Sequence, residues 1–250
     1  MQLNDLNGSA WTRLTKSTWI TQKLLRWSKE KRLALDSTFI LSQKKRITPM
    51  TNKSLDTTRV SLIELFTRKK DIVFDPHSQD GATLDASLYT EREFIGITDT
   101  EQQAVDAMRN IEPSHWDWPN HLFNREFIGD ILTHTDFNMA DLLLTEMPLC
   151  DFDSKVSYQG NVDEYVKQIK NYLKKLKSGK YLALIVADQR HGERYYCRHA
   201  DVIQALQSKE LILQGVINVI RDSQALKAYG YPSTYVPNII NQFVLIFKKT

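Results

Sequence analysis

The sequence predicts an α/β fold in which a mostly parallel sheet is covered by helices on both faces. Short apolar segments with strand character alternate with longer segments of helical periodicity, the order that helical crossovers between parallel strands produce. With 42% hydrophobic and 25% charged residues, a chain of 250 residues can bury a sizeable core. The last two apolar segments are joined by 18 residues without a clear helical pattern, so the final strand is expected to run antiparallel.

Two regions are expected along the chain. Residues 1–48 are expected to form a basic helical segment, and residues 49–250 the α/β domain. From Trp11 to about Leu35 the apolar side chains recur loosely at helical spacing, which predicts one or two helices in the first region.

Seven strands are expected in the domain, each an apolar run flanked by polar or turn residues. In chain order they span residues 71–75, 93–98, 125–130, 140–145, 181–188, 211–222 and 241–249. Helices are expected where apolar residues follow a period near 3.6. These helices span residues 54–70, 82–90, 100–111, 161–180 and 199–210.

Charge is unevenly distributed along the chain. Residues 1–53 hold eleven Lys or Arg and three Asp or Glu, a net of 11 − 3 = +8, which leaves −5 for residues 54–250. A basic segment on a mildly acidic body indicates a polyanionic ligand or an acidic partner surface, and the alternative is a solvated helix face. Two cysteines indicate no disulfide framework and fit a reducing compartment, and no apolar run is long enough to cross a membrane. We therefore expect a cytoplasmic protein without a membrane partner.

The first candidate site is the segment DIVFDPHSQDGATLDASLYTEREFIGIT, residues 71–98. An apolar strand here ends in Asp75 and leads into a polar loop. In a largely parallel sheet the ligand site lies beyond the carboxyl ends of the strands, where the strand order reverses. The loops that surround this cleft are expected to begin after Asp75, Thr98, Asp130, Thr145 and Asp188.

The second candidate site is the segment DLLLTEMPLC, residues 141–150, an apolar strand that runs directly into a turn. The turn consists of Glu146, Met147, Pro148 and Leu149. Taken alone, the carboxylate of Glu146 is a candidate for acid or base chemistry.

In this order and spacing, the two segments resemble motifs of the S-adenosylmethionine-dependent DNA methyltransferases that modify adenine N6 or cytosine N4. The first resembles a strand that leads into D-P-F-x-G-S-G-T-T, and the second stands at the place of D-L-I-x-T/D-S-P-P-Y. LKSGKYLALIVAD and NQFVLIFKK resemble the helix–strand unit and the terminal strand that follow in the family. The resemblance runs from about Pro49 to the end and implies a Rossmann-like methyltransferase sheet of seven strands.

The cofactor motif departs from the family pattern. The resemblance implies cofactor contacts from Asp75, Pro76, Gly81, Thr83, Asp99 and Asp130. Gln79 stands where the family has a glycine that lets the backbone approach the cofactor. Thr98 stands where the family has an acidic residue for the ribose, and Asp99 comes one place late, on the opposite side of a continuing strand. We therefore expect S-adenosylmethionine to be bound by a partner subunit rather than by this chain.

The catalytic-loop motif departs further. In the family the first polar residue orients the target amine, and the final aromatic stacks on the flipped base. The longer side chain of Glu146 would misplace the amine. Leu149 cannot supply base stacking, which is worth roughly 1–3 kcal/mol per base. The four residues resemble the E-P-P-L of the non-catalytic partner subunit in the eukaryotic mRNA adenine methyltransferase heterodimer.

Two further stretches are candidate contact regions. Residues 187–202 interleave basic residues with tyrosines, which suits phosphate contacts and stacking, and the alternative is a polar loop with half-buried tyrosines. Residues 221–242 form a long loop that we interpret as a target or subunit contact, the alternative being a crossover packed on the sheet. The candidate nucleic-acid or partner contacts are Lys44, Lys45, Arg46, Arg190, His191, Arg194 and Arg198. No ligand spacing indicates a metal.

Together these features predict a non-catalytic, nucleic-acid-positioning subunit of a heteromeric DNA methyltransferase. Its expected partners are DNA and an active methyltransferase subunit that supplies the cofactor and an intact loop. One alternative is an active methyltransferase with variant motifs, in which Glu146 orients the amine. A second alternative is a stand-alone DNA-binding regulator that reuses the fold.

Overall fold

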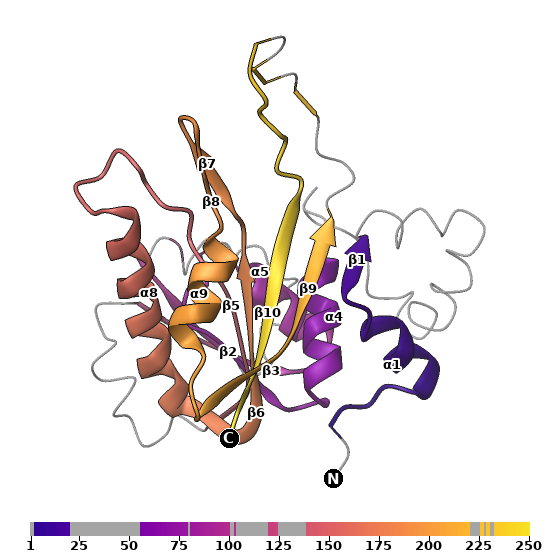
Figure 1. The fold of residues 1–250 in the computed structure, drawn as a ribbon. Helices are drawn as coiled ribbons and strands as arrows, with labels where there is room; N and C mark the ends of the chain where they lie inside the picture. The colour runs from indigo at the N-terminus through magenta and orange to yellow at the C-terminus, as the bar shows by residue number, and fades with distance from the viewer. Residues whose placement is uncertain are drawn as a thin grey trace.

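A computed structural model describes residues 3–20, 56–79, 81–100, 103, 120–124, 139–220, 226–227, 229–230 and 233–250. These residues form an eight-stranded sheet in the order β1-β9-β10-β6-β5-β2-β3-β4 (Figure 1). Its strands are β1 (Thr18–Ile20), β2 (Ile72–Asp75), β3 (Glu93–Thr98), β4 (Asn120–Asn124), β5 (Ala140–Glu146), β6 (Leu176–Val186), β9 (Leu211–Ile220) and β10 (Asn241–Lys249). Neighbouring strands are parallel, except that β10 runs antiparallel to both β6 and β9. The predicted fold class, with its antiparallel last strand, is confirmed.

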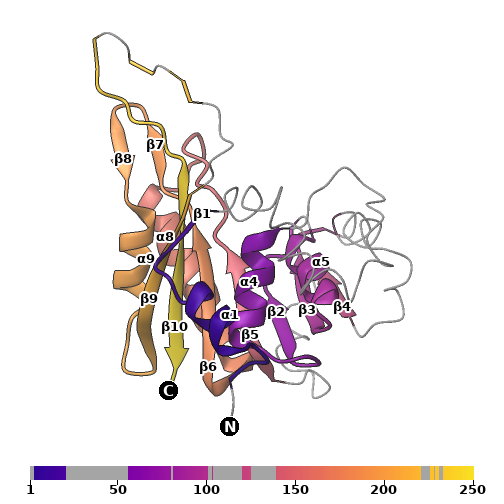
Figure 2. The ribbon, with the colours of Figure 1, turned by 90° about the vertical axis from the view of Figure 1, so that its right-hand side faces the viewer.

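Helices cover both faces of the sheet (Figures 1 and 2). One layer contains α1 (Gly8–Leu14), α4 (Thr57–Phe66) and α5 (Ala82–Tyr89), and the other contains α8 (Tyr158–Tyr172) and α9 (Arg198–Leu206). Consecutive residues of β5 enter opposite cores, because Leu143 packs with α8 and α9 whereas Leu142 and Leu144 pack with α4. A strand buried on both faces reads as a continuous apolar run, which explains why these strands are recognisable from the sequence.

The strand order reverses between β2 and β5. From β2 the chain adds β3 and β4 on one side, and β5 and β6 then lie on the other side. Val73 and Phe74 pair with Leu142 and Leu143 across this boundary. The carboxyl ends of β2 and β5 therefore lie next to each other at the position where open α/β sheets bind ligands.

The N-terminal residues are part of this α/β body. We expected only helices after Trp11, but α1 ends at Leu14 and β1 adds a parallel strand beside β9. The buried ring of Trp19 donates a hydrogen bond to the Leu14 carbonyl over 3.2 Å. The rest of the predicted basic segment, and the boundary predicted after residue 48, lie outside the described residues.

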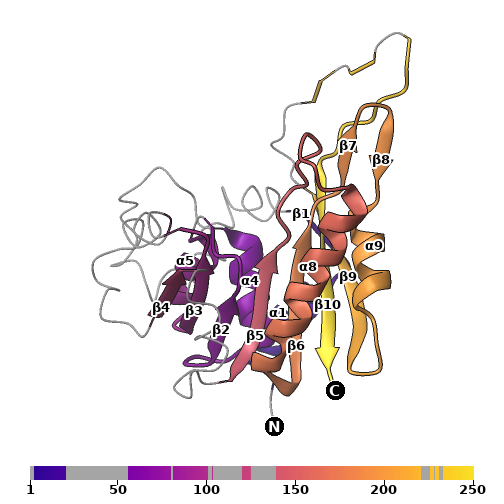
Figure 3. The ribbon, with the colours of Figure 1, turned by 90° about the vertical axis from the view of Figure 1, so that its left-hand side faces the viewer.

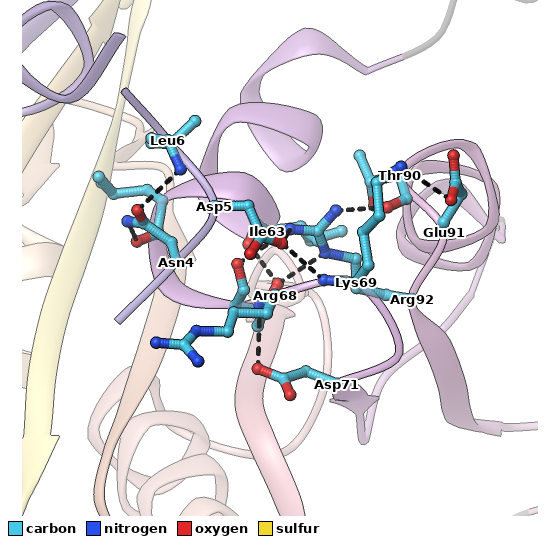
Figure 4. Close-up of polar contacts among 12 residues, drawn as sticks. Asn4, Asp5, Leu6, Ile63, Arg68, Lys69, Asp71, Thr90, Glu91 and Arg92 are labelled. Atoms are coloured by element: carbon cyan, nitrogen blue, oxygen red, sulfur yellow. Dashed lines mark hydrogen bonds and ion pairs between the residues drawn. The ribbon is translucent and has the colours of Figure 1, made fainter. Parts of the chain in front are cut away.

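Polar contacts hold the first described residues against the rest of the protein (Figure 4). The Asn4 amide donates to the Leu65 carbonyl, and the Asp5 carboxylate accepts from the Lys69 backbone over 2.9 Å. Buried Arg92 donates to the side chain and the carbonyl of Thr67. These contacts tie residues 4–5 to the turn between α4 and β2.

Three features of the secondary structure differ from the prediction. β4 spans Asn120–Asn124, where no strand was predicted, and the strand expected at 125–130 lies outside the described residues. α8 ends at Tyr172 rather than near Gly179, because fully buried Leu176 already pairs with Ala140 as part of β6. A hairpin of β7 (Gln189–His191) and β8 (Arg194–Tyr196), which we did not predict, projects beyond the sheet (Figure 3). No helix in the described ranges is long and apolar enough to cross a bilayer.

Candidate functional site

The first part of the site is the end of β2. Asp75 is 3% exposed, and its carboxylate accepts hydrogen bonds from the Thr83 hydroxyl over 2.5 Å and from the His77 backbone over 3.0 Å. Burial raises the pKa of Asp75, although the Thr83 hydroxyl and the charge of Arg59 act in the opposite direction. The chain enters α5 through Gly81, whose φ of +73° lies in the left-handed region that favours glycine. Asp75, Gly81 and Thr83 thus lie close together where β2 leads into α5.

The second part is Arg59 of α4, which the sequence prediction missed. Its Nε donates to the Thr83 hydroxyl over 3.2 Å, one guanidinium nitrogen donates to Asp56, and the other donates to Glu146 over 2.6 Å. Burial acts to lower the pKa of Arg59, but the carboxylates of Asp56, Glu146 and Asp75 outweigh it and raise the pKa above its usual value. The available signal was an arginine three residues after a helix-capping aspartate, directly before the first motif.

The third part is the turn after β5. The two carboxylate oxygens of Glu146 accept from Arg59 and, over 3.1 Å, from the Gln242 amide. Met147 is 3% exposed, and its backbone N–H continues the ladder by donating to the Ile185 carbonyl over 2.9 Å. Leu149 is 66% exposed. Glu146 is therefore held by partners within the protein, whereas Leu149 faces solvent.

The end of β3 offers a poor match to the ribose position. Thr98 is 1% exposed, and its hydroxyl donates to the Thr100 carbonyl over 3.1 Å. Asp99 lies in the bend after the strand and is half-buried, with its backbone N–H donating to the Gln103 side chain over 2.9 Å. Asp130, predicted to contact the adenine ring, is outside the described residues.

The loop between β2 and α5 is closed onto the protein. Pro76 and His77 are buried, and the His77 ring stacks on Tyr165 with a centroid distance of 5.2 Å. The Ser78 backbone N–H donates to the Ile97 carbonyl over 2.8 Å. Gln79, in place of the glycine, is exposed. One backbone N–H of this loop is therefore already hydrogen-bonded to β3.

Arg198 is not a surface contact, contrary to the prediction. It begins α9 and is completely buried, and its guanidinium donates to the carbonyls of Ala187 and Pro148. The side chain turns inward because it joins the end of β6 to the turn after β5. Pro148 thus contributes a carbonyl to a structural clamp.

The other predicted contacts on this side lie on the β7–β8 hairpin. His191 and Arg194 are exposed, whereas Arg190 is half-buried and donates to the Glu193 carbonyl over 3.2 Å. The His191 ring stacks on Phe152 with a centroid distance of 4.7 Å, and Arg194 lies over the Tyr196 ring. These ring contacts attach the loop before α8 to the hairpin. Lys44, Lys45 and Arg46 lie outside the described residues.

Asp188, at the end of β6, organises the start of this hairpin. Its carboxylate contacts the His199 ring nitrogen at 2.8 Å and accepts from the Tyr195 hydroxyl at 2.9 Å. Burial acts to raise the pKa of Asp188, but the contacts with His199 and Tyr195 outweigh it and lower the pKa. The ionised carboxylate therefore stabilises the folded state.

Substitution of Asp188 by asparagine is expected to lower the free energy of unfolding by about 1–2 kcal/mol at pH 5. Because the folded-state pKa is depressed, this contribution is present above the ordinary pKa of 3.8 and is lost as the pH falls through the lower value. Urea unfolding of both proteins from about pH 5 to about pH 2.5 measures this, and the difference should shrink toward the acid end. A difference that stays constant with pH would contradict this assignment.

Solved structures share this fold. TrmN from Thermus thermophilus superposes with a TM-score of 0.55 and 16% identity, over 86% of this chain and 53% of that protein. A protein described as an rRNA-methylase from Clostridium thermocellum superposes with a TM-score of 0.51 and 12% identity, over 80% of this chain and 100% of that one. At these identities the likeness shows the fold alone.

The sequence comparison matches the first part of the chain. A family model described as DNA methylase matches residues 5–110, which contain Arg59, Asp75 and Thr83. Over these residues the chain is similar to the DNA methylase family. The match begins nearer the N-terminus of this methyltransferase-like chain than the resemblance predicted, in agreement with the packing of α1 and β1 on the sheet. It ends before β5, so it does not include Glu146.

A comparison with curated proteins found no significant match to this chain. The chain spans about half of the length of TrmN, 53%. Among the described residues, no group of His, Cys, Asp or Glu side chains has the arrangement of a metal site.

Proposed function

We propose that this chain is a non-catalytic, nucleic-acid-positioning subunit of a heteromeric DNA methyltransferase, acting on adenine N6 or cytosine N4. An active methyltransferase subunit would hold S-adenosylmethionine and carry the loop that orients the amine. This chain would contribute a stable methyltransferase-like body and positively charged surface beside the partner's site.

The observation that carries the proposal is the engagement of Glu146. For methyl transfer, the residue at this position has to accept hydrogen bonds from the target amine and direct its lone pair at the methyl group. Here one oxygen accepts from the Arg59 guanidinium over 2.6 Å and the other from Gln242 over 3.1 Å. An amine would have to displace a charge-assisted hydrogen bond from a largely buried arginine, which costs more than it gains.

The described residues also do not fit S-adenosylmethionine. The ribose position is occupied by Thr98, whose hydroxyl is bonded within its own turn. The Ser78 N–H, on the loop that a cofactor would approach, is paired with Ile97. Asp75 is enclosed by Thr83, His77 and the charge of Arg59. These features support assigning the cofactor to a partner.

Two sources of positive charge support a role in positioning nucleic acid. Arg194 and His191 are exposed on the β7–β8 hairpin, and residues 1–53 carry a net charge of +8. Phosphate contacts of this kind hold a nucleic acid without reading its sequence. Exposed Asp151 and Asp153, which flank Phe152 opposite the hairpin, moderate the charge there, so the basic N-terminal segment would supply most of the affinity.

The test compares the purified chain with each methyltransferase of its source organism that has an intact Ser/Asp-Pro-Pro-aromatic loop. Calorimetric titration with S-adenosylmethionine up to millimolar concentration should give no binding by this chain alone. Transfer of a labelled methyl group to DNA should need the partner and should rise when this chain is added. The matched variant is Glu146→Gln, which keeps the shape of the side chain.

If the proposal is right, Glu146→Gln leaves the activity of the complex nearly unchanged. If Glu146 holds the amine, the variant should lose at least about 100-fold in rate. Cofactor binding and methyl transfer by the chain alone would contradict the proposal in favour of an active enzyme with variant motifs. Tight DNA binding by the chain, with no effect on any methyltransferase, would favour a stand-alone regulator.

A further inference from the structure

Exposed apolar side chains gather at the carboxyl edge of the sheet. Nine large hydrophobic side chains are exposed among the described residues. Six of them lie on segments at this edge: Leu149, Val156, Tyr195, Leu226, Tyr229 and Tyr235. The other three, Trp11, Met139 and Ile212, are scattered over α1 and the opposite edge. A concentration of exposed apolar groups of this kind is typical of a protein–protein contact.

Three of the six side chains belong to the described part of the connection between β9 and β10, and this part rises beyond the body in all three views (Figures 1–3). We call the described residues between 226 and 240 the arm. Leu226 is 70% exposed, Tyr229 is 51% exposed and Tyr235 is 84% exposed. The β7–β8 hairpin stands beside the arm in each view. Its strand β8 carries Tyr195, which is 37% exposed.

Hydrogen bonds connect the described residues of the arm to one another. The Asn238 side chain accepts from the Lys227 N–H over 3.0 Å and donates to the Lys227 carbonyl over 2.8 Å, which links the two ends of the arm. At its tip the Gly230 carbonyl accepts from Ser233 and Thr234. Gly230 has a φ of +71°, and a Cβ there would lie 2.3 Å from the Thr234 carbonyl oxygen. A loop organised in this way loses less conformational entropy when it binds.

The charge of the arm distinguishes between a nucleic acid and a protein as its ligand. Lys227 is the one charged side chain among its described residues, and no acidic residue accompanies it. A surface that binds nucleic acid needs several cations to neutralise phosphates. Exposed tyrosines and leucine with a single cation instead complement an apolar protein surface, since aromatic residues are enriched at such contacts and most charged residues are depleted.

We propose that the arm, with Leu149 and Tyr195 beneath it, is the docking surface for a second protein, the active methyltransferase subunit. This inference rests on the proposed function and names the surface through which it operates. A chain docked here covers the carboxyl edge of this sheet, where Leu149 is exposed next to the engaged Glu146. The partner's apolar surface packs on Tyr229 and Tyr235, and the partner's own site lies outside this chain.

The experiment measures how tightly this chain binds other purified methyltransferases from the source organism. The enzymes chosen are those that have an intact Ser/Asp-Pro-Pro-aromatic loop. The binding variants are Tyr229→Ser/Tyr235→Ser and Asn238→Ala, and the matched control is Ile212→Ser, an exposed hydrophobic residue at the opposite edge. Truncation of a central aromatic costs binding at least about tenfold, so the double variant should bind about 100-fold more weakly. Asn238→Ala should weaken binding by a smaller factor, and Ile212→Ser should bind as wild type. Unchanged unfolding midpoints show that the variants remain folded.

Each outcome separates the two proposals. If a partner binds the wild type and all variants equally, and is activated equally by them, the arm is not the docking surface, but the proposed function still holds. No binding to any partner, and no activation, overturns both. If the wild type dimerises with itself and the tyrosine variant does not, a second copy is the ligand and the named partner is wrong. If the tyrosine variant loses affinity only for single-stranded or duplex DNA, the arm binds nucleic acid and the proposal fails.

Discussion

Replacement of Arg59 by methionine is expected to lower the free energy of unfolding by about 3–5 kcal/mol, because the change leaves partly buried carboxylates without their counter-charge. The Arg59 side chain is 10% exposed and bridges Asp56 and Glu146, while its charge also faces Asp75. Methionine fills a similar volume, so the loss would come from the electrostatics more than from a cavity. Chemical denaturation at pH 7 measures the effect.

A control and a double-mutant cycle test the origin of this loss. Lys69→Met removes an exposed ion pair with Glu91, where the lysine side chain is 60% exposed, and should cost at most about 1 kcal/mol. Adding Glu146→Gln to Arg59→Met should recover part of the lost stability, since one stranded charge is then removed. If Arg59→Met costs no more than Lys69→Met, the guanidinium does not hold the turn after β5, and the main support for a non-catalytic site disappears.

The fold was predictable because its strands are buried on both faces. β2, β5, β6 and β10 appear in the sequence as short continuous apolar runs, and the missing helical pattern before β10 correctly indicated its antiparallel direction. β1 was missed because a three-residue edge strand carries too little periodicity to be distinguished from a helix end. The predicted end of α8 was too late in the chain because Leu176 pairs with Ala140 in the sheet. This tertiary pairing overrides the local helix propensity.

The candidate site was predictable in position but not in its contacts. Asp75 and Glu146 occupy the ends of the adjoining strands β2 and β5, which carry the two motifs. What the sequence could not show is that Arg59, twenty-four residues before Thr83, contacts both parts of the site. Motif reasoning treats an arginine in a basic loop as a surface group, so the same method placed Arg198 on the surface. Which arginine is buried depends on the carbonyls and carboxylates that the fold gathers around it.

Substitution of Arg198 by lysine is the second change expected to have a large effect, about 2–4 kcal/mol of unfolding free energy. Two different nitrogens of the guanidinium donate hydrogen bonds to the Ala187 and Pro148 carbonyls. A single ammonium cannot occupy both positions. A lysine also lacks the planar fork of donors, and burial lowers the pKa of its ammonium and favours the neutral form. The measurement is chemical denaturation together with amide hydrogen exchange at Met147 and Cys150, on the turn that the clamp holds.

The matched control is Arg194→Lys, four residues earlier, where the arginine is exposed over the Tyr196 ring and its replacement should cost at most about 1 kcal/mol. Faster exchange at Cys150, whose N–H is bonded to Gln189 over 2.7 Å, is expected for Arg198→Lys and not for Arg194→Lys. Should Arg198→Lys instead unfold like the wild type and weaken DNA binding, Arg198 would be a nucleic-acid contact after all. The two arginines thus separate a structural clamp from a surface contact, although they lie in one short basic stretch of the sequence.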